Sequence, residues 1–352
     1  MAFPAMFAHR YELRSSLGQG AQGEVYEAFD LHEQETVALK LLRPTPDVWA
    51  EAAILRRLAD HHILPIRNAD VHVGQPFLAT VLAAHGSVDG QISAAGSAGL
   101  STADTVRWVR HACHGIARGH DSKLVHNDIK PANLFLNDNH ECVVADWGFA
   151  AAIDPSTGFA LVPGATAETV APEIAIAVAG GSTPLATTRS DIYSLGATAF
   201  WMLTGCPPID LSGRVGVLAR MQGAATLVPP RLQDVAPHVP RWVRDKIEKA
   251  MSIDPANRYD SAHAFAADLG NRPVLPRQWI RTDEHTGHLA CWRGVPQSGA
   301  TYVMCLEQGS TASRRTVTTV TANSGRRVMR GCGSATAATW PRVVRRLIAA
   351  LG

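Results

Sequence analysis

Two carboxylates, an amide and an ammonium lie close together in the middle of the sequence. Asp128, Lys130 and Asn133 follow one another at short spacing, and Asp146 comes one short segment later. One carboxylate at such a place can accept a proton from an attacking hydroxyl group, and another can hold a divalent metal ion against phosphate oxygens. The Asn133 amide oxygen adds a neutral metal ligand, and the Lys130 ammonium can neutralise charge on a phosphoryl group. These residues are therefore candidates for phosphate chemistry assisted by a metal ion.

Two short apolar runs separate these polar groups and predict the element that holds them. Residues 133–136 and 142–145 have the composition of strands, and the turn formers Asn137, Asp138 and Asn139 lie between them. Two apolar runs around such a turn are typical of a β-hairpin. We therefore expect a hairpin whose ends carry the charged groups. The alternative is two polar turns that flank a hairpin and have no chemical role.

A glycine-rich stretch near the N-terminus offers a second place for phosphate binding. Residues 18–26, GQGAQGEVY, contain Gly18, Gly20 and Gly23. Glycines let the backbone approach phosphate oxygens and direct N–H groups at them. The GxGxxG pattern alone is weak, because many turns and dinucleotide sites share it. Here a strand-like segment, residues 35–42, follows where a dinucleotide fold would have a helix, which argues against a dinucleotide site.

Lys40 lies among apolar residues of that strand-like segment and needs a carboxylate partner, because an unpaired buried ammonium is costly. Residues 48–59 have helical spacing of apolar side chains, with Asp47 as the expected N-cap. Glu51 is the acidic residue of this predicted helix, so we expect it to pair with Lys40. The alternatives are a lysine whose head group reaches water at a sheet edge and a solvated glutamate near a helix N-terminus.

These motifs together resemble one protein family. HNDIKPAN at residues 126–133 is similar to the catalytic loop of eukaryotic-like protein kinases, and DWG at residues 146–148 is similar to their metal-binding triplet. Further matches occur in the family's order. They are the glycine-rich loop, VALK at 37–40, APE at 171–173, DIYSLG at 191–196 and DPANRY at 254–259. The resemblance covers residues 11–269 and implies a serine/threonine protein kinase of bacterial type.

The resemblance implies a role for each matching residue. Asp128 would orient the acceptor hydroxyl and take its proton, Lys130 would stabilise the transferring phosphoryl group, and Lys40 would position the phosphates of ATP. Asn133 and Asp146 would hold Mg²⁺, with Mn²⁺ as a substitute. The residues implied in ATP binding are Leu17, Gly18, Gln19, Gly20, Gly23, Val25, Ala38, Lys40, Glu51, Thr80, Val81 and Ala83, the last two through their backbone.

Other matching residues are implied in structure or in acceptor choice. Thr166 aligns with a threonine that contacts the catalytic aspartate and favours Ser/Thr acceptors. Asp191 would accept backbone hydrogen bonds from the catalytic loop, and Arg258 would form a buried ion pair with Glu173. These residues support the serine/threonine kinase interpretation.

The sequence departs from the family pattern at two positions. The resemblance implies an activation segment at residues 149–173. Asn127 stands where the family usually has an arginine that grips a phosphate on this segment. We therefore expect activity not to depend on such a phosphate. Trp147 replaces the usual phenylalanine, and we expect its aromatic ring to fill the same space.

The predicted fold class is α+β, with a two-lobed kinase fold followed by a small antiparallel β-sheet and a helix. Residues 1–10 form an N-terminal extension, and residues 11–270 form the kinase domain. Its β-rich N-lobe is expected at 11–86 and its α-rich C-lobe at 87–270. The remaining residues, 271–352, are expected to form the small domain.

Two segments have less definite predictions. Residues 86–99 are rich in Gly, Ser and Ala and are expected to be a loose surface segment. After a linker marked by Pro273 and Pro276, the tail shows short strand patterns separated by Gly, Ser or Pro. Its predicted strands are 278–281, 289–293, 302–307, 315–321 and 326–330, and its predicted helix is 340–351.

Composition limits the cellular setting and the partners. The 352 residues include 46% hydrophobic residues and six cysteines without a CxxC pair, which indicates a globular protein of a reducing compartment. Because no signal pattern or membrane-length apolar stretch occurs, we expect a cytoplasmic protein without a membrane partner. The net charge is +2, but the part from residue 271 onward has 12 arginines, no lysine and three acidic residues, which give +9. The rest of the chain therefore carries −7.

The basic tail leaves alternatives open. Its arginines could bind an anionic partner, either nucleic acid or an acidic protein, or they could form a solvated face. Zinc ligands could be present among its histidines and cysteines, although cysteines in apolar strands also serve as small hydrophobic residues. The candidate ligands are His285, His288, Cys291, Cys305 and Cys332.

Three functions are compatible with these observations. The first is a Ser/Thr protein kinase that transfers the γ-phosphate of Mg-ATP to protein hydroxyls. The second is a pseudokinase scaffold that binds ATP and presents the basic tail to a partner. The third is a kinase whose tail recruits nucleic acid.

Overall fold

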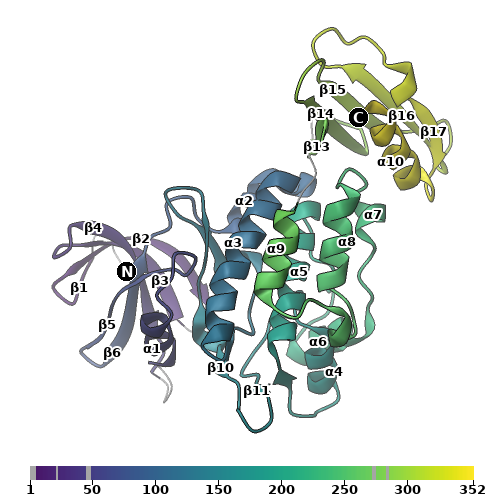
Figure 1. Cartoon of the computed structure of the whole chain (residues 1–352). Helices are drawn as coiled ribbons and strands as arrows, with labels where there is room; N and C mark the ends of the chain where they lie inside the picture. The colour runs from purple at the N-terminus through teal and green to yellow at the C-terminus, as the bar shows by residue number, and fades with distance from the viewer. Residues whose placement is uncertain (1–4, 21–22, 45–48, 272–274, 283–284) are drawn as a thin grey trace.

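The computed structural model describes the chain except for residues 1–4, 21–22, 45–48, 272–274 and 283–284. The expected N-cap Asp47 and the linker residue Pro273 lie outside the described residues. Figure 1 shows a β-rich lobe, a helical lobe and a second sheet with one helix, in this order along the chain. The predicted α+β architecture is confirmed.

The N-lobe is a six-stranded antiparallel sheet with the order β1-β2-β3-β4-β6-β5. Its core includes Tyr11, Leu13, Val37, Leu39 and Phe77. Along β4 the buried side chains Val37 and Leu39 alternate with partly buried ones, as the two faces of a sheet require. The strands are β1 (Ala5–Phe7), β2 (Tyr11–Gly20), β3 (Gly23–Asp30), β4 (Glu35–Leu42), β5 (Ile66–His72) and β6 (Gln75–Val81).

One helix, α1 (Ala50–Arg57), lies beside this sheet and is shorter than the predicted 48–59. Its first turn contains Glu51, and Ala52 and Leu55 are buried. Trp49 precedes it as the N-cap residue and makes no capping hydrogen bond through its side chain. The buried face therefore orients Glu51 toward the sheet.

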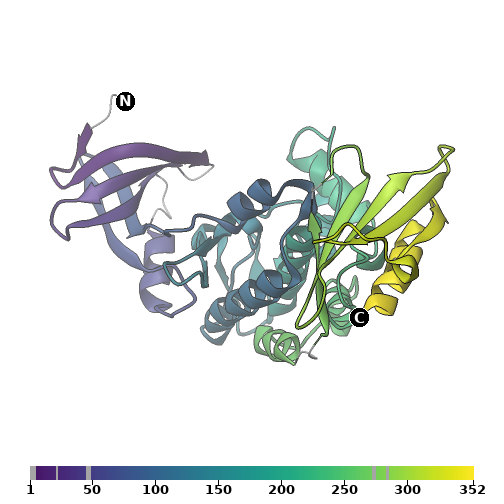
Figure 2. The ribbon, with the colours of Figure 1, turned by 90° about the horizontal axis from the view of Figure 1, so that it is seen from above.

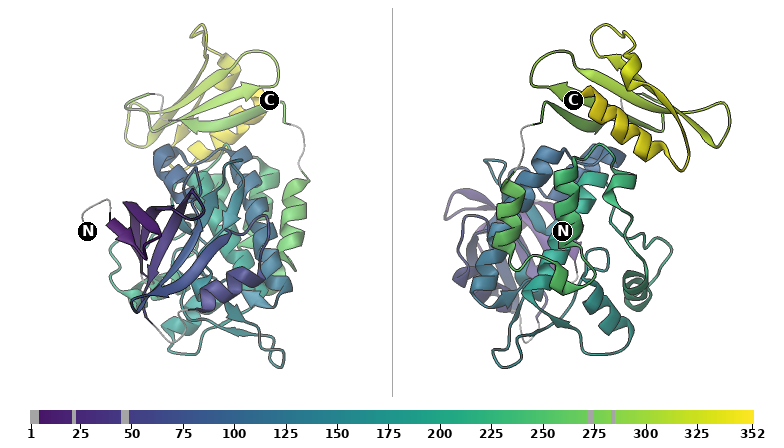
Figure 3. Two further views of the ribbon diagram at one scale, coloured as in Figure 1. Left: turned by 90° about the vertical axis from the view of Figure 1, so that its left-hand side faces the viewer. Right: turned by 45° about the vertical axis from the view of Figure 1, so that its right-hand side comes forward.

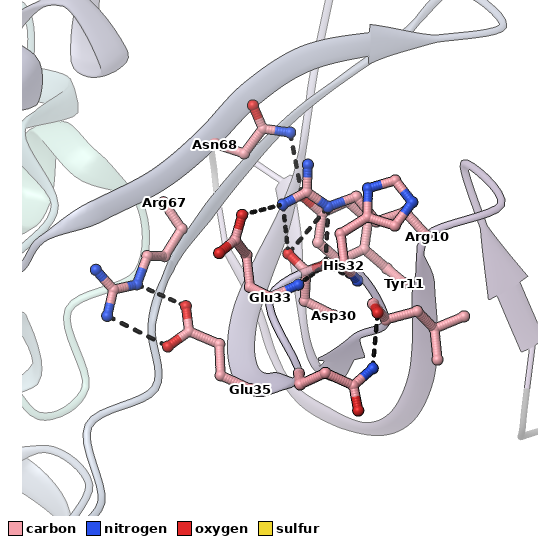
Figure 4. A network of polar contacts seen from close by, with 10 residues as sticks. Arg10, Tyr11, Asp30, His32, Glu33, Glu35, Arg67 and Asn68 are labelled. Carbon is pink, nitrogen blue, oxygen red and sulfur yellow. Dashed lines mark hydrogen bonds and ion pairs between the residues drawn. The ribbon is translucent and has the colours of Figure 1, made fainter.

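A polar network joins two turns of the N-lobe (Figure 4). The guanidinium of Arg10 donates to both carboxylate oxygens of Asp30, at 2.7 and 2.8 Å for the closest contacts. The backbone N–H groups of His32 and Glu33 also donate to Asp30, whose side chain is fully buried. Burial alone would raise the pKa of this carboxyl, but these hydrogen bonds outweigh it and lower the pKa. Asp30 is therefore a stabilising buried carboxylate.

Replacing Asp30 with asparagine is expected to lower the free energy of unfolding by about 1.5–3 kcal/mol at pH 7, the range for hydrogen bonds to charged groups. Because the folded pKa lies below the unfolded value of about 3.9, this stabilisation is present above pH 4 and disappears as the pH falls through the folded pKa. Urea unfolding of both proteins from pH 7 to pH 3 should show the difference shrinking.

Glu33→Gln is the matched control for this change, because Glu33 is exposed and lies 3.7 Å from Arg10. An exposed ion pair contributes less than about 1 kcal/mol, so this variant should unfold almost as the wild type does. A difference between Asp30→Asn and wild type that persists undiminished at pH 3 would contradict the assignment.

The C-lobe is helical, and α5 forms its centre. Nearly every residue of α5 is buried, from Ser190 to Leu203, with Thr187 as a capping-box residue at its start. Helices α3, α8 and α9 surround it (Figure 1). The helices are α2 (Val88–Ala95), α3 (Thr102–Asp121), α4 (Pro172–Ala179), α5 (Thr188–Thr204), α6 (Val217–Thr226), α7 (Leu232–Val235), α8 (Arg241–Ala250) and α9 (Ala262–Gly270).

Short strands and 3₁₀ turns connect the C-lobe helices. The predicted hairpin is present as β8 (Leu134–Leu136) paired with β9 (Cys142–Val144). Asn133 belongs to the 3₁₀ turn before β8 and not to the strand. The other short elements are β7 (Leu124–Val125) with β10 (Ala151–Ala152), β11 (Ala160–Leu161) with β12 (Leu185–Ala186), and the 3₁₀ turns Gly96–Ala98, Pro131–Asn133, Trp147–Phe149 and Pro255–Asn257.

The prediction of a loose segment at residues 86–99 is wrong, because α2 lies there. The Ser87 hydroxyl accepts a hydrogen bond from the backbone N–H of Gly90 and caps the helix at 3.1 Å. Val88 and Ile92 bury their side chains in the main core of the C-lobe. Tertiary burial of these two residues outweighs the low helix propensity of the Gly and Ser residues.

The C-terminal part is a five-stranded antiparallel sheet with the order β13-β14-β15-β16-β17, closed by α10. The predicted helix 340–351 is confirmed as α10 (Trp340–Leu351). The predicted strand 326–330 is wrong: residues 329–331 form a 3₁₀ turn, and the fifth strand follows it. The strands are β13 (Arg277–Thr282), β14 (Ala290–Pro296), β15 (Tyr302–Gln308), β16 (Arg314–Thr321) and β17 (Gly333–Thr336).

The two faces of this sheet differ. One face packs on α10, with Trp292, Met304 and Val317 against Leu347 and Leu351. The opposite face has a much smaller apolar group, Cys291, Val303 and Cys305, with Val320 and Ala322 beside it. The main core of this part is therefore a single layer between sheet and helix.

The C-terminal part lies against the C-lobe, away from the N-lobe sheet (Figures 1 and 2). Figure 3 shows the same arrangement from two more sides, with α10 near α7. Arg345 of α10 donates to the backbone carbonyl of Gln233 and lies 3.7 Å from the Asp234 carboxylate. Within the described residues, none of the helices combines the length and the apolar character that crossing a membrane requires.

Candidate active site

Asp128 lies at the centre of a buried group of polar side chains. Lys130 Nζ donates to Asp128 Oδ2 at 2.8 Å, and the Thr166 hydroxyl donates to Oδ1 at 2.6 Å. Asn133 Nδ2 donates to Oδ2 at 2.9 Å. Burial alone would raise the pKa of the Asp128 carboxyl, but the charge of Lys130 and the hydrogen bonds from Lys130 and Thr166 outweigh burial and lower the pKa. Asp128 is therefore an ionised carboxylate at neutral pH.

The loop that carries Asp128 is held by the start of α5. The carboxylate of Asp191 accepts hydrogen bonds from the backbone N–H groups of His126, at 2.8 Å, and Asn127, at 3.0 Å. His120 Nε2 lies 2.9 Å from the same carboxylate, a partner that the sequence did not suggest. The bonds to Asp191 fix the backbone next to Asp128, in the way that the family resemblance implied.

Lys40, Glu51 and Asp146 form a second charged cluster, built from both lobes. Lys40 Nζ on β4 lies 2.9 Å from Glu51 Oε2 on α1 and 3.1 Å from Asp146 Oδ1 after β9. Burial alone would lower the pKa of the Lys40 ammonium, but the two carboxylates outweigh burial and raise it. The backbone N–H of Trp147 also donates to Glu51. The expected Lys40–Glu51 pair is therefore present and also contacts the triplet at residues 146–148.

The hairpin brings Asn133 and Asp146 to the same end. The backbone N–H of Ala145 donates to the Asn133 carbonyl at 2.9 Å, just beyond the β8–β9 ladder. Asp146 has a left-handed backbone, with φ of 57°, a conformation that aspartate tolerates better than most residues. Asn133 is buried, whereas the Asp146 side chain is 34% exposed. The Asn133 amide thus lies beside Asp128, and the Asp146 carboxylate lies beside Lys40.

The glycine-rich segment forms the turn end of the β2–β3 ladder, in which Gly18 pairs with Val25 and Gly20 with Gly23. Ala21 and Gln22 lie outside the described residues. A Cβ atom on Gly23 would be 2.0 Å from the Leu41 carbonyl oxygen, so no larger residue fits there. At Gly23 the backbone of β3 therefore lies in close contact with the backbone of β4, its neighbour in the sheet.

The other residues implied in ATP binding lie around this turn and on the neighbouring strands. Val25 pairs with Lys40 across β3 and β4, and Ala38 pairs with Thr80 across β4 and β6. The Val81 N–H donates to the Pro65 carbonyl at 3.1 Å, so this N–H is already engaged within the protein. Leu17 is largely exposed, Gln19 donates to Glu24 at 3.3 Å, and the Ala83 carbonyl accepts from the Gly86 N–H at 3.1 Å.

The tryptophan of the DWG triplet packs against a glycine on α3, which leaves room for its ring. Trp147 is buried, its ring centroid is 4.7 Å from that of His126, and its indole N–H has no partner among the described residues. A Cβ atom on Gly119 would be 2.6 Å from Trp147 Cη2. The ring thus occupies space that a side chain at position 119 would fill, and Gly119 was not among the residues that we singled out from the sequence.

Asn127 is tied to the start of the activation segment. Its amide donates to the Phe149 carbonyl at 3.0 Å, and its backbone has φ of 67°. The side chain is neutral, so at this position the catalytic loop offers no cation to a phosphate on the segment. The independence of activity from such a phosphate stays a prediction.

Glu173 and Arg258 join the end of the activation segment to the C-lobe. Arg258 makes two contacts with the Glu173 carboxylate, at 2.7 and 2.8 Å. It also donates to the backbone carbonyls of Ser252, Arg189 and Ile253. The expected pair is present, and the three carbonyl bonds were not predictable from the sequence.

Comparison with known proteins gives a consistent result. A protein-family profile for the protein kinase domain matches residues 11–269. A probable serine/threonine-protein kinase of Corynebacterium efficiens is 29% identical over 280 residues, which are 75% of this chain and 41% of the relative. PknB, a serine/threonine-protein kinase of Mycolicibacterium smegmatis, is 30% identical over 344 residues, 91% of this chain and 52% of the relative. PknD of Mycobacterium tuberculosis is 30% identical over 279 residues, 73% of this chain and 38% of the relative.

This chain therefore spans about half the length of these relatives, or less. The family profile nevertheless matches well over half of the chain, and the matched residues include both lobes and the two charged clusters between them. The two-lobed fold, the order of the motifs and the profile match agree, and we conclude that the chain belongs to the protein kinase family.

Proposed function

We propose that this chain is a serine/threonine protein kinase that transfers the γ-phosphate of ATP to hydroxyl groups of protein substrates. The observation that carries the proposal is the convergence of Lys130 and Thr166 on the ionised carboxylate of Asp128. An ionised carboxylate can accept a proton, and a lysine on the same carboxylate can stabilise a phosphoryl group as it moves. The relatives named above are serine/threonine-protein kinases, which supports the same class.

In the proposed reaction Asp128 orients the acceptor hydroxyl and takes its proton as the oxygen attacks. Lys130 neutralises charge on the transferring group, and its hydrogen bond to Thr166, at 3.0 Å, holds it beside Asp128. Lys40, fixed by Glu51, positions the phosphates on the donor side. Each of these side chains is held by a second protein group, so little reorganisation is needed when the substrates bind.

The residues at the end of the hairpin suit a hard divalent cation. Asp146 and Asn133 offer oxygen ligands, and such ligands suit Mg²⁺ and also Mn²⁺. These two residues would hold the ion, which, when bound, neutralises negative charge on the phosphates. The partial exposure of Asp146 leaves its carboxylate open to a ligand.

ATP would be held by the glycine-rich turn and the strands below it. Gly18, Gly20 and Gly23 allow close approach of the backbone to phosphates, and the Val81 carbonyl and Ala83 N–H would hydrogen-bond to the adenine. Apolar contacts with the base would come from Leu17, Val25 and Ala38.

We also infer that the chain divides into a kinase domain, residues 11–270, with lobes at 11–86 and 87–270, and a basic domain, residues 271–352. The separate sheet and core of the basic part support this division. An anionic partner for its arginines and a cytoplasmic location stay predictions. The second of these is supported by six free cysteines, which suit a reducing compartment.

The second candidate is a pseudokinase scaffold, and phosphotransfer by the full chain distinguishes the two. With γ-labelled ATP and Mg²⁺, we expect label on serine or threonine residues of the protein or of a generic acceptor, identified by phosphosite mapping. Chelation of the metal with EDTA should abolish transfer. ATP binding without transfer to any acceptor tested would favour the scaffold instead.

A further inference from the structure

Four potential metal ligands meet on the face of the C-terminal sheet that α10 does not cover. His285 and His288 lie in the connection between β13 and β14, Cys291 lies on β14, and Cys305 lies directly opposite it on β15. One ligand atom from each residue lies within 4.8 Å of all the others. Both sulfur atoms are buried, whereas the imidazoles lie nearer to solvent.

Four separations within this cluster are close to, or slightly shorter than, those of a tetrahedral zinc site. Cys291 Sγ lies 3.2 Å from Cys305 Sγ and 3.5 Å from Nδ1 of both His285 and His288. His285 Nδ1 lies 3.2 Å from Cys305 Sγ. Bond lengths of about 2.3 Å to sulfur and about 2.0–2.1 Å to nitrogen place tetrahedral ligand atoms roughly 3.4–3.8 Å apart. Shifts of a few tenths of an ångström would therefore accommodate the ion.

We propose that His285, His288, Cys291 and Cys305 bind one structural Zn²⁺ ion. Two thiolates with two imidazoles in tetrahedral arrangement are a donor set typical of zinc. Binding would release one proton from each thiol, so the two thiolates balance the charge of the ion. All four ligands come from the protein, which leaves no open position for a substrate and makes the site structural.

The fold gives this ion a role. The C-terminal sheet has its main core on the α10 side, and the opposite face has only a small apolar group around Cys291 and Cys305. A small core of this kind is often supplemented by a metal. The ion would fasten the β13–β14 connection to β15, the central strand of the sheet. It would thus stabilise the face that α10 leaves uncovered.

The fifth candidate from the sequence, Cys332, is not part of this cluster. Its sulfur accepts hydrogen bonds from the backbone N–H of Thr319 and from Arg327 Nε, both at 3.4 Å. It is partly buried and belongs to the same small sheet region. Cys332→Ser is therefore a matched control for Cys291→Ser and Cys305→Ser.

The test is the zinc content of the purified full chain, measured by inductively coupled plasma mass spectrometry after removal of loosely bound metal. We expect about one zinc ion per chain in the wild type and in Cys332→Ser. In Cys291→Ser and Cys305→Ser the zinc content per chain should fall at least about ten-fold, because each substitution removes a ligand. His263→Ala serves as a histidine control and should keep its zinc, since it belongs to a separate surface group of histidines, with His61, His62 and His114.

A measurement on the wild type covers the case in which the cysteine variants do not fold. Wild-type protein stripped by a chelator and reloaded with Co²⁺ should show the strong visible absorption of a tetrahedral thiolate site. A Cys291–Cys305 disulfide found by mass spectrometry of protein prepared without reductant, or a stripped wild type that takes up neither Zn²⁺ nor Co²⁺, would overturn the proposal. If His263→Ala lost its zinc and Cys291→Ser kept it, the zinc would bind at the surface histidine group, and this result would also overturn the proposal.

Discussion

Replacing Asp128 with asparagine is expected to lower the rate of phosphotransfer by about 10²–10⁴-fold, the usual contribution of general base catalysis. The asparagine has nearly the same shape, but it cannot take the proton of the acceptor hydroxyl. It also removes the charge that holds Lys130, 2.8 Å away. ATP binds through other residues, so its dissociation constant should change by less than about two-fold. Initial rates with γ-labelled ATP and fluorescence-based ATP titration measure the two quantities.

Asp138→Asn is the control for this experiment, because it makes the same chemical change at an exposed position in the β8–β9 turn. It should transfer phosphate at the wild-type rate. If Asp128→Asn also kept the wild-type rate, Asp128 would not be the base. If both variants lost ATP binding, the effect would be on folding, and circular dichroism would show it.

Replacing Arg258 with alanine is expected to lower the free energy of unfolding by about 3–5 kcal/mol, the range measured when one partner of a buried ion pair is removed. The Arg258 side chain is fully buried, and it holds Glu173 at 2.7 Å together with three backbone carbonyls. Alanine leaves all these acceptors without their donor. For a domain of this size the melting temperature should fall by roughly 10 °C, measured by differential scanning calorimetry.

Arg241→Ala makes the same change at an exposed arginine of α8, whose pair with Asp245 lies at the surface. Its stability should stay within about 0.5 kcal/mol of the wild type. Equal losses in the two variants would show that burial and pairing of Arg258 contribute nothing specific. A double-mutant cycle with Glu173→Gln separates the ion pair from the three carbonyl bonds, because only the first involves Glu173.

Much of the fold was predictable because apolar patterns and catalytic motifs are local in the sequence. The hairpin around residues 137–141 and the helix 340–351 each carry their own turn formers or amphipathic spacing. Where the pattern is weak the prediction was wrong. Residues 86–99 contain few strong helix formers, and α2 exists because Val88 and Ile92 find a place in the core of the C-lobe. The short strand β17, GSAT, has no apolar pattern and follows from its main-chain pairing with β16.

The candidate site was predictable as a set of residues, but only part of its contacts was. The pairs of Lys40 with Glu51 and of Arg258 with Glu173 follow from matching positions in a known family. The fit of Trp147 against Gly119 depends on the approach of α3 to the triplet, which no local pattern encodes. The His285 cluster likewise depends on strand register, because Cys305 comes opposite Cys291 only in the β14–β15 pairing.

The ion pair between Lys40 and Asp146 also has a consequence for folding. Its two residues are 106 positions apart in the sequence and belong to different lobes. Closing so long a loop costs conformational entropy that a single ion pair does not recover. The pair therefore depends on both lobes having already formed and docked, and a chain with only its N-terminal sheet folded has no site. Separation of the two lobes breaks this pair even while each lobe stays folded, so formation of the pair reports on how the lobes are docked.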